Sequence, residues 1–494
     1  MKTVGIIGSG VSGLCAAAVL AAEGHKTMVF EKNSQLGGRL RQFESNGYVF
    51  DMGPSWYWMP DVFDRFFERF GHKSSDFYEL VKLDPGFQVI FNNSEVMKVP
   101  ADWDGVLELF EKQESGAADQ LKKFMIEAAY KYETGMNNLV YQPGLSLMEL
   151  ITPATIKGVF RLQLFSSFSS HVRKYFKSEK LISLMEFPVL FLGAMPKNTP
   201  ALYSLMNYAG LKQGTFYPMG GFKKVVDAMV QVASERGVEF YTSEPIESIR
   251  QSEKSKLSLK TSNRHLLLDG IIASADYAHV ESQLLEKRDR NYSETYWNSK
   301  TFAPSCLIFY IGVNKKIDKL EHHNLFFDAD FPQHAKDIYQ DPGWPANPLF
   351  YVCCPSKTDP SVAPVGKENL FVLMPIAPGL EDSEVLRQRY FHKIIKRLEN
   401  FAGVTISTGI EYMKSYCVSD FIADYNSYKG NAYGLANTLR QTANLKPKIK
   451  NRKLTNFYYA GQLTVPGPGV PPSIVSGQVA AAELIKSLNY EKNI

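Results

Sequence analysis

The stretch TVGIIGSGVSGLCAAAVLAAEGHKTMVFE, residues 3–31, decides the fold. Residues 3–7 form a short apolar run rich in β-branched side chains, which is typical of a buried parallel strand. Residues 14–23 are rich in alanine and predict a helix, and residues 26–30 predict a second strand that Glu31 closes. Strand, glycine-rich turn, helix, strand and acid follow one another within about 30 residues, which is the context that a dinucleotide-binding fingerprint requires.

Each glycine of the turn has a mechanical reason. Gly8 permits the tight turn, Gly10 lets the backbone approach a pyrophosphate, and Gly13 allows the helix to pack closely on the strand. The helix N-terminus then presents free N–H groups and a partial positive charge to the phosphate, and we assign Val11 and Ser12 to the same site. A glycine-rich turn in an ordinary α/β unit is the alternative, which the complete strand–helix–acid context disfavours.

The residues that follow distinguish FAD from a nicotinamide dinucleotide. Glu31 can accept hydrogen bonds from ribose hydroxyls. The run Gly37-Gly38-Arg39 suits a further backbone approach and a counter-charge for phosphate, and residues 50–55, FDMGPS, supply another tight loop. An extended FAD has use for these extra loops, whereas a nicotinamide cofactor has none, so FAD is predicted. The further predicted cofactor residues of this region are Lys32, Gly38, Arg39, Leu40, Gly53, Pro54 and Ser55.

Further blocks carry a resemblance to a known family. They are an aromatic-Pro-x-Gly-Gly turn at 217–221, the segments 237–249 and 273–276, and a C-terminal signature that runs from FYYAG at 457–461 through PGPGVP at 466–471 to 476–477. With the N-terminal fingerprint, they resemble the FAD-dependent carotenoid desaturases of the bacterial phytoene-desaturase type, within the wider amine-oxidase-like flavoproteins. The resemblance runs nearly end to end. Amine oxidases share the N-terminal part but lack the Pro-Gly-x-Gly-Val-Pro run.

The C-terminal block has a physical interpretation of its own. Residues 454–460 read as a strand that Gly461 ends, and 473–487 read as a helix whose start Pro471 and Pro472 signal. The resemblance implies that this helix points its N-terminus at the flavin, where a partial positive charge would stabilise the anionic reduced form. The alternative is a C-terminal packing helix with a rigid entrance. The residues assigned to the cofactor by this likeness are Gly461, Gln462, Gly469, Val470 and Pro471, with Ile246 placed where relatives contact adenine.

The positions of these blocks predict the domain organisation. A discontinuous, Rossmann-like FAD-binding domain of the α/β class is expected from residues 1–85, 212–290 and 440–494. The insertions 86–211 and 291–439 would build a mixed α+β substrate domain. Two domains are therefore expected from the 494 residues.

Composition excludes several other classes. With 45% apolar and 21% charged residues the chain can bury an ordinary core, and a net charge of +4 does not argue for nucleic acid. Five cysteines without a CxxC pattern predict neither a disulfide framework nor a thiolate zinc site. No metal site is predicted, because the adjacent pair His322-His323 lacks a supporting pattern and Cys353-Cys354 is expected in a strand.

One region suggests contact with a membrane. Residues 155–180 contain six basic residues and one acidic residue, interleaved with aromatic and aliphatic side chains, which is typical of an interfacial helix. We expect a membrane-contacting helical part at about 146–195 and a peripheral position on the cytoplasmic side of the membrane. The alternative is a pair of lid helices whose apolar face is core. The uncharged stretch 3–22 contains four glycines, which argues against a signal peptide.

The resemblance implies a desaturase. Two hydrogens would leave adjacent carbons of a carotenoid, one of them as a hydride to the flavin, and the electrons would pass on to oxygen or a quinone. Many relatives carry His or Gln before the Pro-Gly pair where Val465 stands here, and this departure favours 3,4-desaturation of a 1-hydroxycarotenoid over desaturation of phytoene. An FAD-dependent amine oxidase and a non-enzymatic prenyl-lipid carrier are the further alternatives.

A long apolar substrate is expected to bind in a channel lined by apolar and aromatic side chains. The candidates for that channel are Trp56, Tyr57, Trp58, Phe216, Tyr217 and Val465. No catalytic residue and no general base can be named from the sequence.

Overall fold

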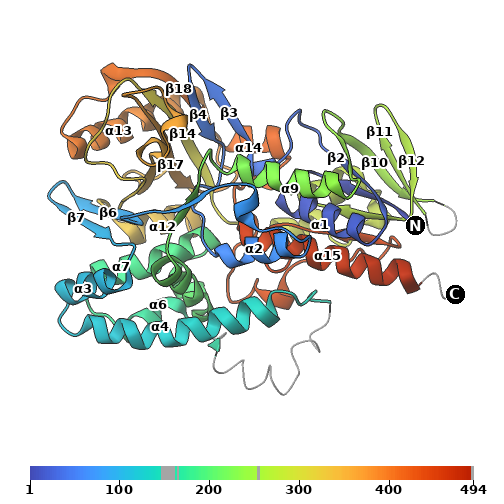
Figure 1. The fold of residues 1–494 in the computed structure, drawn as a ribbon, viewed down its shortest axis with the longest axis horizontal. Helices are drawn as coiled ribbons and strands as arrows, with labels where there is room; N and C mark the ends of the chain where they lie inside the picture. Colours follow the sequence, from blue (N-terminus) through green and yellow to red (C-terminus); the bar gives the residue numbers. More distant parts are fainter. Residues whose placement is uncertain (146–161, 164–165, 253–255, 491–494) are drawn as a thin grey trace.

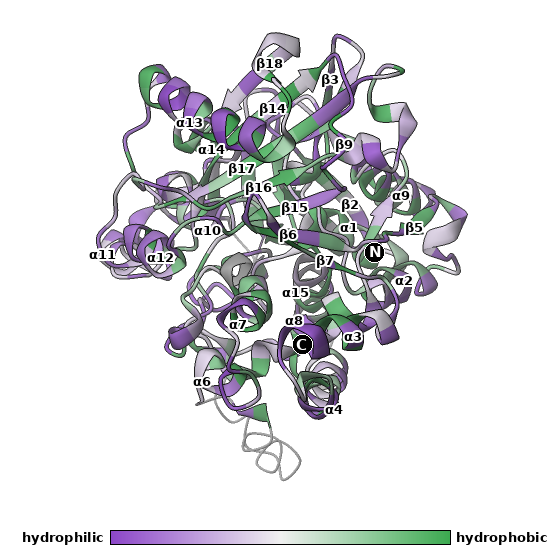
Figure 2. Cartoon of the chain, turned by 90° about the vertical axis from the view of Figure 1, so that its left-hand side faces the viewer, coloured by the Kyte–Doolittle hydropathy of each residue, from purple (hydrophilic) through white to green (hydrophobic). Residues whose placement is uncertain are grey.

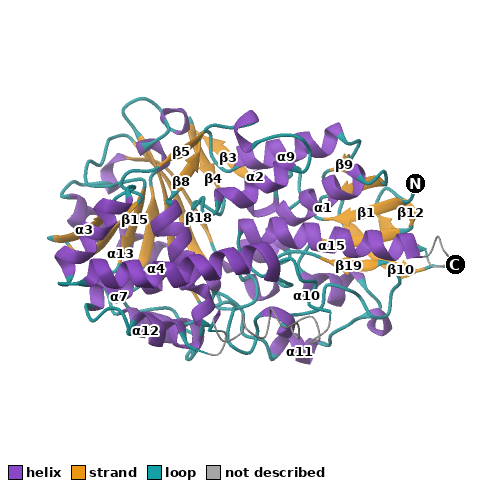
Figure 3. Ribbon diagram, turned by 60° about the horizontal axis from the view of Figure 1, so that its bottom comes forward, coloured by secondary structure: helices purple, strands orange, loops and turns teal. Residues whose placement is uncertain are grey.

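The computed structural model describes residues 1–145, 162–163, 166–252 and 256–490. Its strands gather at the two ends of an elongated molecule, with helices between them (Figure 1, Figure 3). A five-stranded parallel sheet of order β19-β13-β1-β2-β9 lies at the end that holds both termini. A seven-stranded sheet of order β18-β14-β17-β16-β15-β6-β7 lies at the other end. The predicted Rossmann-like α/β class is confirmed.

The parallel sheet is built on the N-terminal fingerprint. Strands β1 (Thr3–Ile7) and β2 (Lys26–Phe30) have the predicted bounds. Helix α1 (Val11–Ala22) begins three residues earlier than predicted, because extended Gly10 already serves as its N-cap. The other strands come from distant parts of the chain: β9 is Glu239–Tyr241, β13 is Gly270–Ala273, and β19 is Phe457–Tyr459, which is shorter than the predicted 454–460.

Helices and a small sheet cover the two faces of the parallel sheet. Helices α1, α9 (Lys223–Glu235) and α15 (Val470–Tyr490) pack together, and the antiparallel sheet β10-β11-β12 lies opposite (Figure 1). The packing of α1 against α15 is very close, because a Cβ added to Gly477 would stand 2.3 Å from the carbonyl oxygen of Ser12. Only glycine allows this approach.

The inner strands of the seven-stranded sheet are buried on both faces. Along β14 (Ser305–Val313), Leu307 and Phe309 pack with Phe391 and Leu398 of helix α13 (Glu384–Ala402). The alternate residues, such as Ile308, face the centre of the molecule. In Figure 2 the strands of the interior carry much green, whereas the outer turns of α13 are purple. The other strands of this sheet are β6 (Phe87–Asn92), β7 (Glu95–Val99), β15 (His323–Phe326), β16 (Phe350–Cys353), β17 (Glu368–Ile376) and β18 (Ile410–Tyr416).

A helical layer lies below this sheet in Figure 1. It contains α3 (Trp103–Gln113), α4 (Ala117–Thr134), α6 (Phe168–Val172), α7 (Glu179–Glu186) and α8 (Leu205–Asn207). The remaining regular elements are β3 (Gln42–Ser45), β4 (Tyr48–Asp51), α2 (Pro60–Glu68), β5 (Leu80–Lys82), β8 (Phe216–Pro218), β10 (Ile246–Gln251), β11 (Leu257–Thr261), β12 (His265–Leu268), α10 (Tyr277–His279), α11 (Glu294–Asn298), α12 (Phe331–Tyr339) and α14 (Val418–Tyr425).

The segment predicted to contact a membrane is only partly described. Residues 146–161 and 164–165 lie outside the described residues. Of the rest, Leu162, Phe168 and Phe176 are buried, so these side chains are core, as the alternative interpretation held. No described helix combines the length and the apolar character needed to cross a bilayer.

The two large sheets draw on separate parts of the chain. The strands of the parallel sheet lie within residues 3–30, 239–273 and 457–459, and those of the seven-stranded sheet within 87–99 and 305–416. The residue boundaries given above for two domains remain a prediction.

The close contact of α1 with α15 leads to a test. Gly477→Ala should lower the free energy of unfolding by about 1–3 kcal/mol, because the added methyl group overpacks the contact with Ser12 although alanine is the better helix former. The matched control is Gly343→Ala, whose Cβ would meet the Asp341 oxygen at an ordinary 3.7 Å, and which should change stability by less than about 0.5 kcal/mol. Denaturant unfolding measures both. Equal effects would contradict the packing argument.

Candidate active site

A cavity of about 500 Å³ opens at the carboxyl edge of the parallel sheet. Gly8, Glu31, Ser274 and Gly461 follow the ends of β1, β2, β13 and β19, and all four line the cavity. Ligands of open parallel sheets bind at this edge, because the turns after neighbouring strands meet there. The turns after four strands, far apart in the sequence, therefore form one site.

The structure brings nearly all predicted cofactor residues to this cavity. Gly13 is the exception, since it lies under the turn, where its Cβ would stand 2.1 Å from the carbonyl oxygen of Gly8. The predicted residues that line the cavity are Gly8, Gly10, Val11, Ser12, Glu31, Lys32, Gly38, Arg39, Leu40, Gly53, Pro54, Ser55, Ile246, Gly461, Gln462, Gly469, Val470 and Pro471.

Three glycines form an open cradle at the N-terminus of α1. Gly8, with φ of +91°, lies against the backbone of Ser274 and Ala275. Gly38 has φ of +58°, and a Cβ added to it would lie 3.0 Å from the Cα of Gly10. A Cβ on Gly10 itself would meet nothing within 4 Å, so it would point into open space. Backbone without side chains therefore borders the space where a pyrophosphate would lie.

Arg39 supplies a positive charge beside this cradle. Its Nη2 donates to Ser427 Oγ at 3.3 Å and to the Asn431 carbonyl at 3.4 Å, and its guanidinium lies 4.8 Å from the ring centre of Tyr425. Its Nε is buried without a hydrogen-bond partner, and burial lowers the pKa of Arg39. A buried cation with an unused donor fits an anionic ligand, because the ligand's oxygens satisfy both the charge and the N–H.

Glu31 and Lys32 are already engaged by the chain. One Glu31 carboxylate oxygen accepts from the backbone and hydroxyl of Ser9, at 3.0 and 2.7 Å, and the other accepts from the backbone and side chain of Asn33, at 2.9 and 3.1 Å. Lys32 donates to the Ala423 carbonyl at 2.5 Å and to Asn426 at 3.2 Å. The ribose contact of Glu31 therefore remains a prediction.

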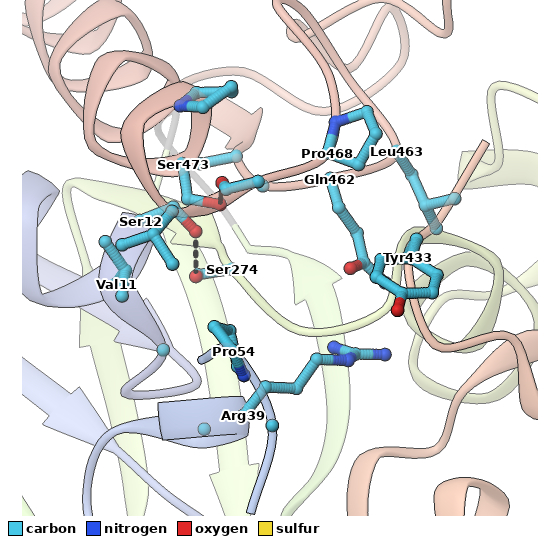
Figure 4. Close-up of a pocket in the computed structure, with 18 of the residues that line it drawn as sticks. Val11, Ser12, Arg39, Pro54, Ser274, Tyr433, Gln462, Leu463, Pro468 and Ser473 are labelled. Carbon is cyan, nitrogen blue, oxygen red and sulfur yellow. Dashed lines mark hydrogen bonds between the residues drawn. The ribbon is translucent and has the colours of Figure 1, made fainter. Parts of the chain in front are cut away.

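The C-terminal helix closes the other side of the cavity (Figure 4). Val11 and Ser12 of α1 face Gln462 and Pro468 of the C-terminal segment across the space that Arg39 and Pro54 border, and Ser12 Oγ lies 2.7 Å from Ser274 Oγ. Helix α15 begins at Val470, three residues before the predicted start. Val470, Pro471, Pro472 and Ser473 all line the cavity, so the positive end of the helix dipole borders the site.

The cavity continues from the cradle along an apolar wall. Three of the six predicted channel residues, Trp56, Trp58 and Val465, line it. Tyr57 does not line it: its ring stacks on that of Phe63, with centroids 4.2 Å apart, and its hydroxyl lies 2.9 Å from that of Tyr78. Successive side chains of an extended segment point to opposite sides, so Tyr57 faces away from the cavity that its two neighbours line.

Phe216 and Tyr217 also lie away from the cavity lining. Both belong to β8, which pairs with β5, and Phe216 also bridges to Tyr57 on the far side of that segment. The hydroxyl of Tyr217 donates to Asp359 at 3.3 Å. The structure therefore does not bring this aromatic pair to the cavity, because β8 pairs with β5 and packs elsewhere.

Sequence reasoning missed most of the apolar wall. The members that were missed lie more than a hundred residues from the fingerprint, many of them in the seven-stranded sheet. They are Met136, Leu139, Leu202, Met206, Cys306, Ile308, Tyr351, Phe371, Leu373 and Tyr433, and Trp56, Trp58 and Val465 complete the wall. The alternation of side chains along β14 and β17 could have shown which residues lie on the same face of the sheet. It could not have shown that this face meets the cofactor.

The apolar wall, in its described part, carries no group suited to accept a proton at neutral pH. Burial raises the pKa of the Cys306 thiol to about 12, and burial also raises the pKa of Tyr351 and Tyr433 well above the usual range. All three are neutral at pH 7. The charged residues of the cavity, such as Asp276 and Asp424, belong to its cofactor end.

The structure also gathers three residues that the sequence left unconnected. One nitrogen each of His322 and His323 and the sulfur of Cys353 lie within 4.8 Å of one another, and all three residues are buried. Cys353 ends strand β16, so only the first cysteine of the predicted strand pair lies in a strand.

The fold, the cradle and the unused donor of Arg39 define a flavin-dependent oxidoreductase. A family model described as flavin-containing amine oxidoreductase matches residues 11–485, and the chain belongs to that family. The Methanosarcina mazei oxidoreductase structure has the same fold, with a TM-score of 0.65 over 96% of this chain and 99% of that one at 16% identity.

Within that family the chain belongs to the carotenoid desaturases. It is 41% identical to a carotenoid 3,4-desaturase of Haloarcula japonica, over 99% of each chain. It is 27% identical to a zeta-carotene-forming phytoene desaturase of Myxococcus xanthus, over 98% of this chain and 94% of the other. FAD is its cofactor, and the residues named above fit it.

Gly10 provides the first test of the cradle. Gly10→Ala should fold normally, because φ of −63° with extended ψ suits alanine and the methyl group meets no protein atom. The methyl group fills the space of the pyrophosphate, and overpacking of about 1–3 kcal/mol should raise the Kd of FAD roughly 5- to 150-fold. Flavin titration of apoprotein measures the Kd, and denaturant unfolding checks the fold. Unchanged affinity would contradict the placement of the phosphate.

Arg39 provides the second test, with Arg41 as its control. Arg39→Met removes a charged donor worth about 1.5–3 kcal/mol and should weaken FAD binding about 10- to 150-fold, with little loss of apoprotein stability. Arg41 lies over the same Tyr425 ring but pairs with Asp424 at 2.6 Å. Arg41→Met should therefore lower stability more than flavin affinity. The opposite pattern in the two variants would refute the assignment.

Proposed function

We propose that this enzyme introduces a carbon–carbon double bond by 3,4-desaturation of a 1-hydroxycarotenoid. The observation that carries the proposal is the full-length match, at 41% identity, to a protein named a carotenoid 3,4-desaturase. A cavity that runs without interruption from the cofactor cradle along the apolar wall supports it, because a polyene needs apolar contact beside the flavin.

The wall would align the substrate. Trp56, Trp58 and the aliphatic members of the wall offer contact along an extended hydrocarbon, while the charged groups stay at the cofactor end. When bound, FAD supplies the acceptor for a hydride. The adjacent carbon loses a proton, and conjugation with the polyene delocalises the charge that forms. A proton made labile in this way can leave to water, which agrees with a described wall that lacks a base.

Desaturation of phytoene is the alternative reaction. It is supported by the match to the phytoene desaturase of Myxococcus xanthus, but at 27% identity rather than 41%. Val465, which lines the cavity, stands where many relatives carry His or Gln, so this part of the wall differs from theirs and the substrate is expected to differ from phytoene. We therefore favour the hydroxylated substrate.

An amine substrate is disfavoured by the same wall. A carboxylate would compensate the charge of an ammonium group in an apolar site, and the described wall offers none. The glycine cradle and Arg39 also disfavour a carrier that works without flavin, because such a carrier needs no site for the phosphates of a cofactor.

We also propose a peripheral position on the cytoplasmic side of the membrane and reoxidation by oxygen or a quinone. A carotenoid dissolves in the bilayer, so its enzyme must reach that surface. Arg173 and Lys180 of the basic segment are on the surface but already pair with Glu179 and Glu95. Sedimentation with anionic and neutral vesicles tests the first proposal. Assays without air, with and without a quinone, test the second.

The substrate test uses purified, FAD-loaded enzyme in lipid vesicles. A 1-hydroxylated carotenoid of the γ-carotene type should be converted to a product that absorbs at longer wavelength, because the conjugated chain is extended. Phytoene and a polyamine, the latter with a peroxide readout, are run in parallel. Conversion of phytoene alone would overturn the preference for the hydroxylated substrate, and release of peroxide from the polyamine alone would overturn desaturation.

A further inference from the structure

We propose that His322, His323 and Cys353 form a zinc-binding site behind the wall of the substrate cavity. One ligand atom from each residue lies within 4.8 Å of the others. The exposed fractions of the residues are 4%, 0% and 1%. The site is separate from the cofactor cradle, and its occupation does not depend on which carotenoid is the substrate.

Strand pairing gathers these three residues. In the antiparallel pair β15–β16, His323 stands directly opposite Cys353, and side chains of opposed residues share one face of the sheet with their Cβ atoms about 4.5–5.5 Å apart. His322 precedes β15, and its carbonyl accepts from the backbone N–H of Cys354 at 2.8 Å. The two imidazole rings lie with centroids 4.5 Å apart. The pairing of β15 with β16 therefore places His323 and Cys353 together, and the ring contact brings His322 beside them.

The histidine rings are held from one side and open on the other. His322 Nδ1 lies 2.8 Å from Thr358 Oγ1, and His323 Nδ1 lies 2.6 Å from the hydroxyl of Tyr351. The Nε2 atom of each ring is buried and has no hydrogen-bond partner. Metal-binding histidines usually show this arrangement, in which a hydrogen bond to one nitrogen orients the ring and leaves the other for the ion. A single ion bound to both Nε2 atoms and to the thiol of Cys353 would satisfy these two buried nitrogens.

Zinc suits this ligand set. Imidazole nitrogen and cysteine sulfur bind Zn²⁺ at about 2.0–2.1 and 2.3 Å, which places tetrahedral ligands roughly 3.4 Å apart. Binding would require the three ligand atoms to close from a separation of up to 4.8 Å to that spacing. On binding, Cys353 releases its proton to solvent and its thiolate forms the Zn–S bond, with no change in oxidation state. Three protein ligands leave a fourth position for a water molecule.

The site would act on the cavity by positioning its wall. The indole of Trp56 stacks on the His323 ring, with centroids 4.1 Å apart and an interplanar angle of 8°. The Tyr351 hydroxyl, which contacts His323, also lies 2.9 Å from Ser55 Oγ. Trp56, Tyr351 and Ser55 all line the cavity. A bound ion would therefore hold the side chains where the cofactor end meets the apolar wall.

The test starts from the FAD-loaded wild-type enzyme, stripped with a chelator and reloaded with Zn²⁺ or Co²⁺. We expect one Zn²⁺ per chain by elemental analysis, a rise in melting temperature on reloading, and with Co²⁺ a near-ultraviolet charge-transfer band from the thiolate. Flavin content is measured alongside, so that loss of cofactor is not mistaken for loss of metal. Reloaded enzyme without stoichiometric zinc and without the cobalt band would overturn the proposal, and would point to a buried water in its place.

Variants locate the ion. Cys353→Ser should abolish the cobalt band, and Thr358→Val, which removes only the ring-orienting contact of His322, should weaken zinc binding about 10- to 100-fold. The matched control is Cys354→Ser: this adjacent thiol is equally buried but lies 3.6 Å from Ser356 Oγ, outside the cluster, and its loss should leave the band intact. Loss of the band in Cys354→Ser with retention in Cys353→Ser would refute the assignment. The wild-type measurement stands even if a variant does not fold.

Discussion

The structure depends on how closely helix α1 can lie to the strand before it and to helix α15. The contact is made by backbone alone: a Cβ on Gly13 would collide with the Gly8 oxygen at 2.1 Å, and one on Gly477 with the Ser12 oxygen at 2.3 Å. This approach puts the N–H groups at the start of α1 on the same edge as the turns after β2, β13 and β19. The anion-binding end of the helix and the rest of the site are thereby fixed in one place.

The two sheets divide the chemical work between them. The parallel sheet contributes glycine turns, a buried arginine and helix ends, which suit the phosphates and the flavin. The seven-stranded sheet contributes one face to its own core with α13 and the other to the apolar wall. A single cavity spans both sheets, so a hydrocarbon substrate can lie beside the flavin and still contact only the apolar wall.

Particular residues show how far local pattern carries. Nearly all the residues predicted for the cofactor line the cavity, because a mononucleotide-binding turn uses contiguous residues whose roles follow from backbone geometry. The run Trp56-Tyr57-Trp58 could not be sorted in the same way. An extended segment sends alternate side chains to opposite sides, and sequence does not say which side faces the cavity. For Phe216 and Tyr217 the deciding factor was the pairing of β8 with β5.

Residues 3–31 are enough to establish a dinucleotide-binding α/β unit, and the C-terminal glycine and proline run adds the likeness to desaturases, because both signals are local. The composition of the apolar wall and the meeting of His322, His323 and Cys353 were decided only in three dimensions. Cys353 faces His323 because of the register between β15 and β16. Strand register joins residues 30 positions apart through side-chain burial and backbone hydrogen bonds, and neither leaves a motif in the sequence.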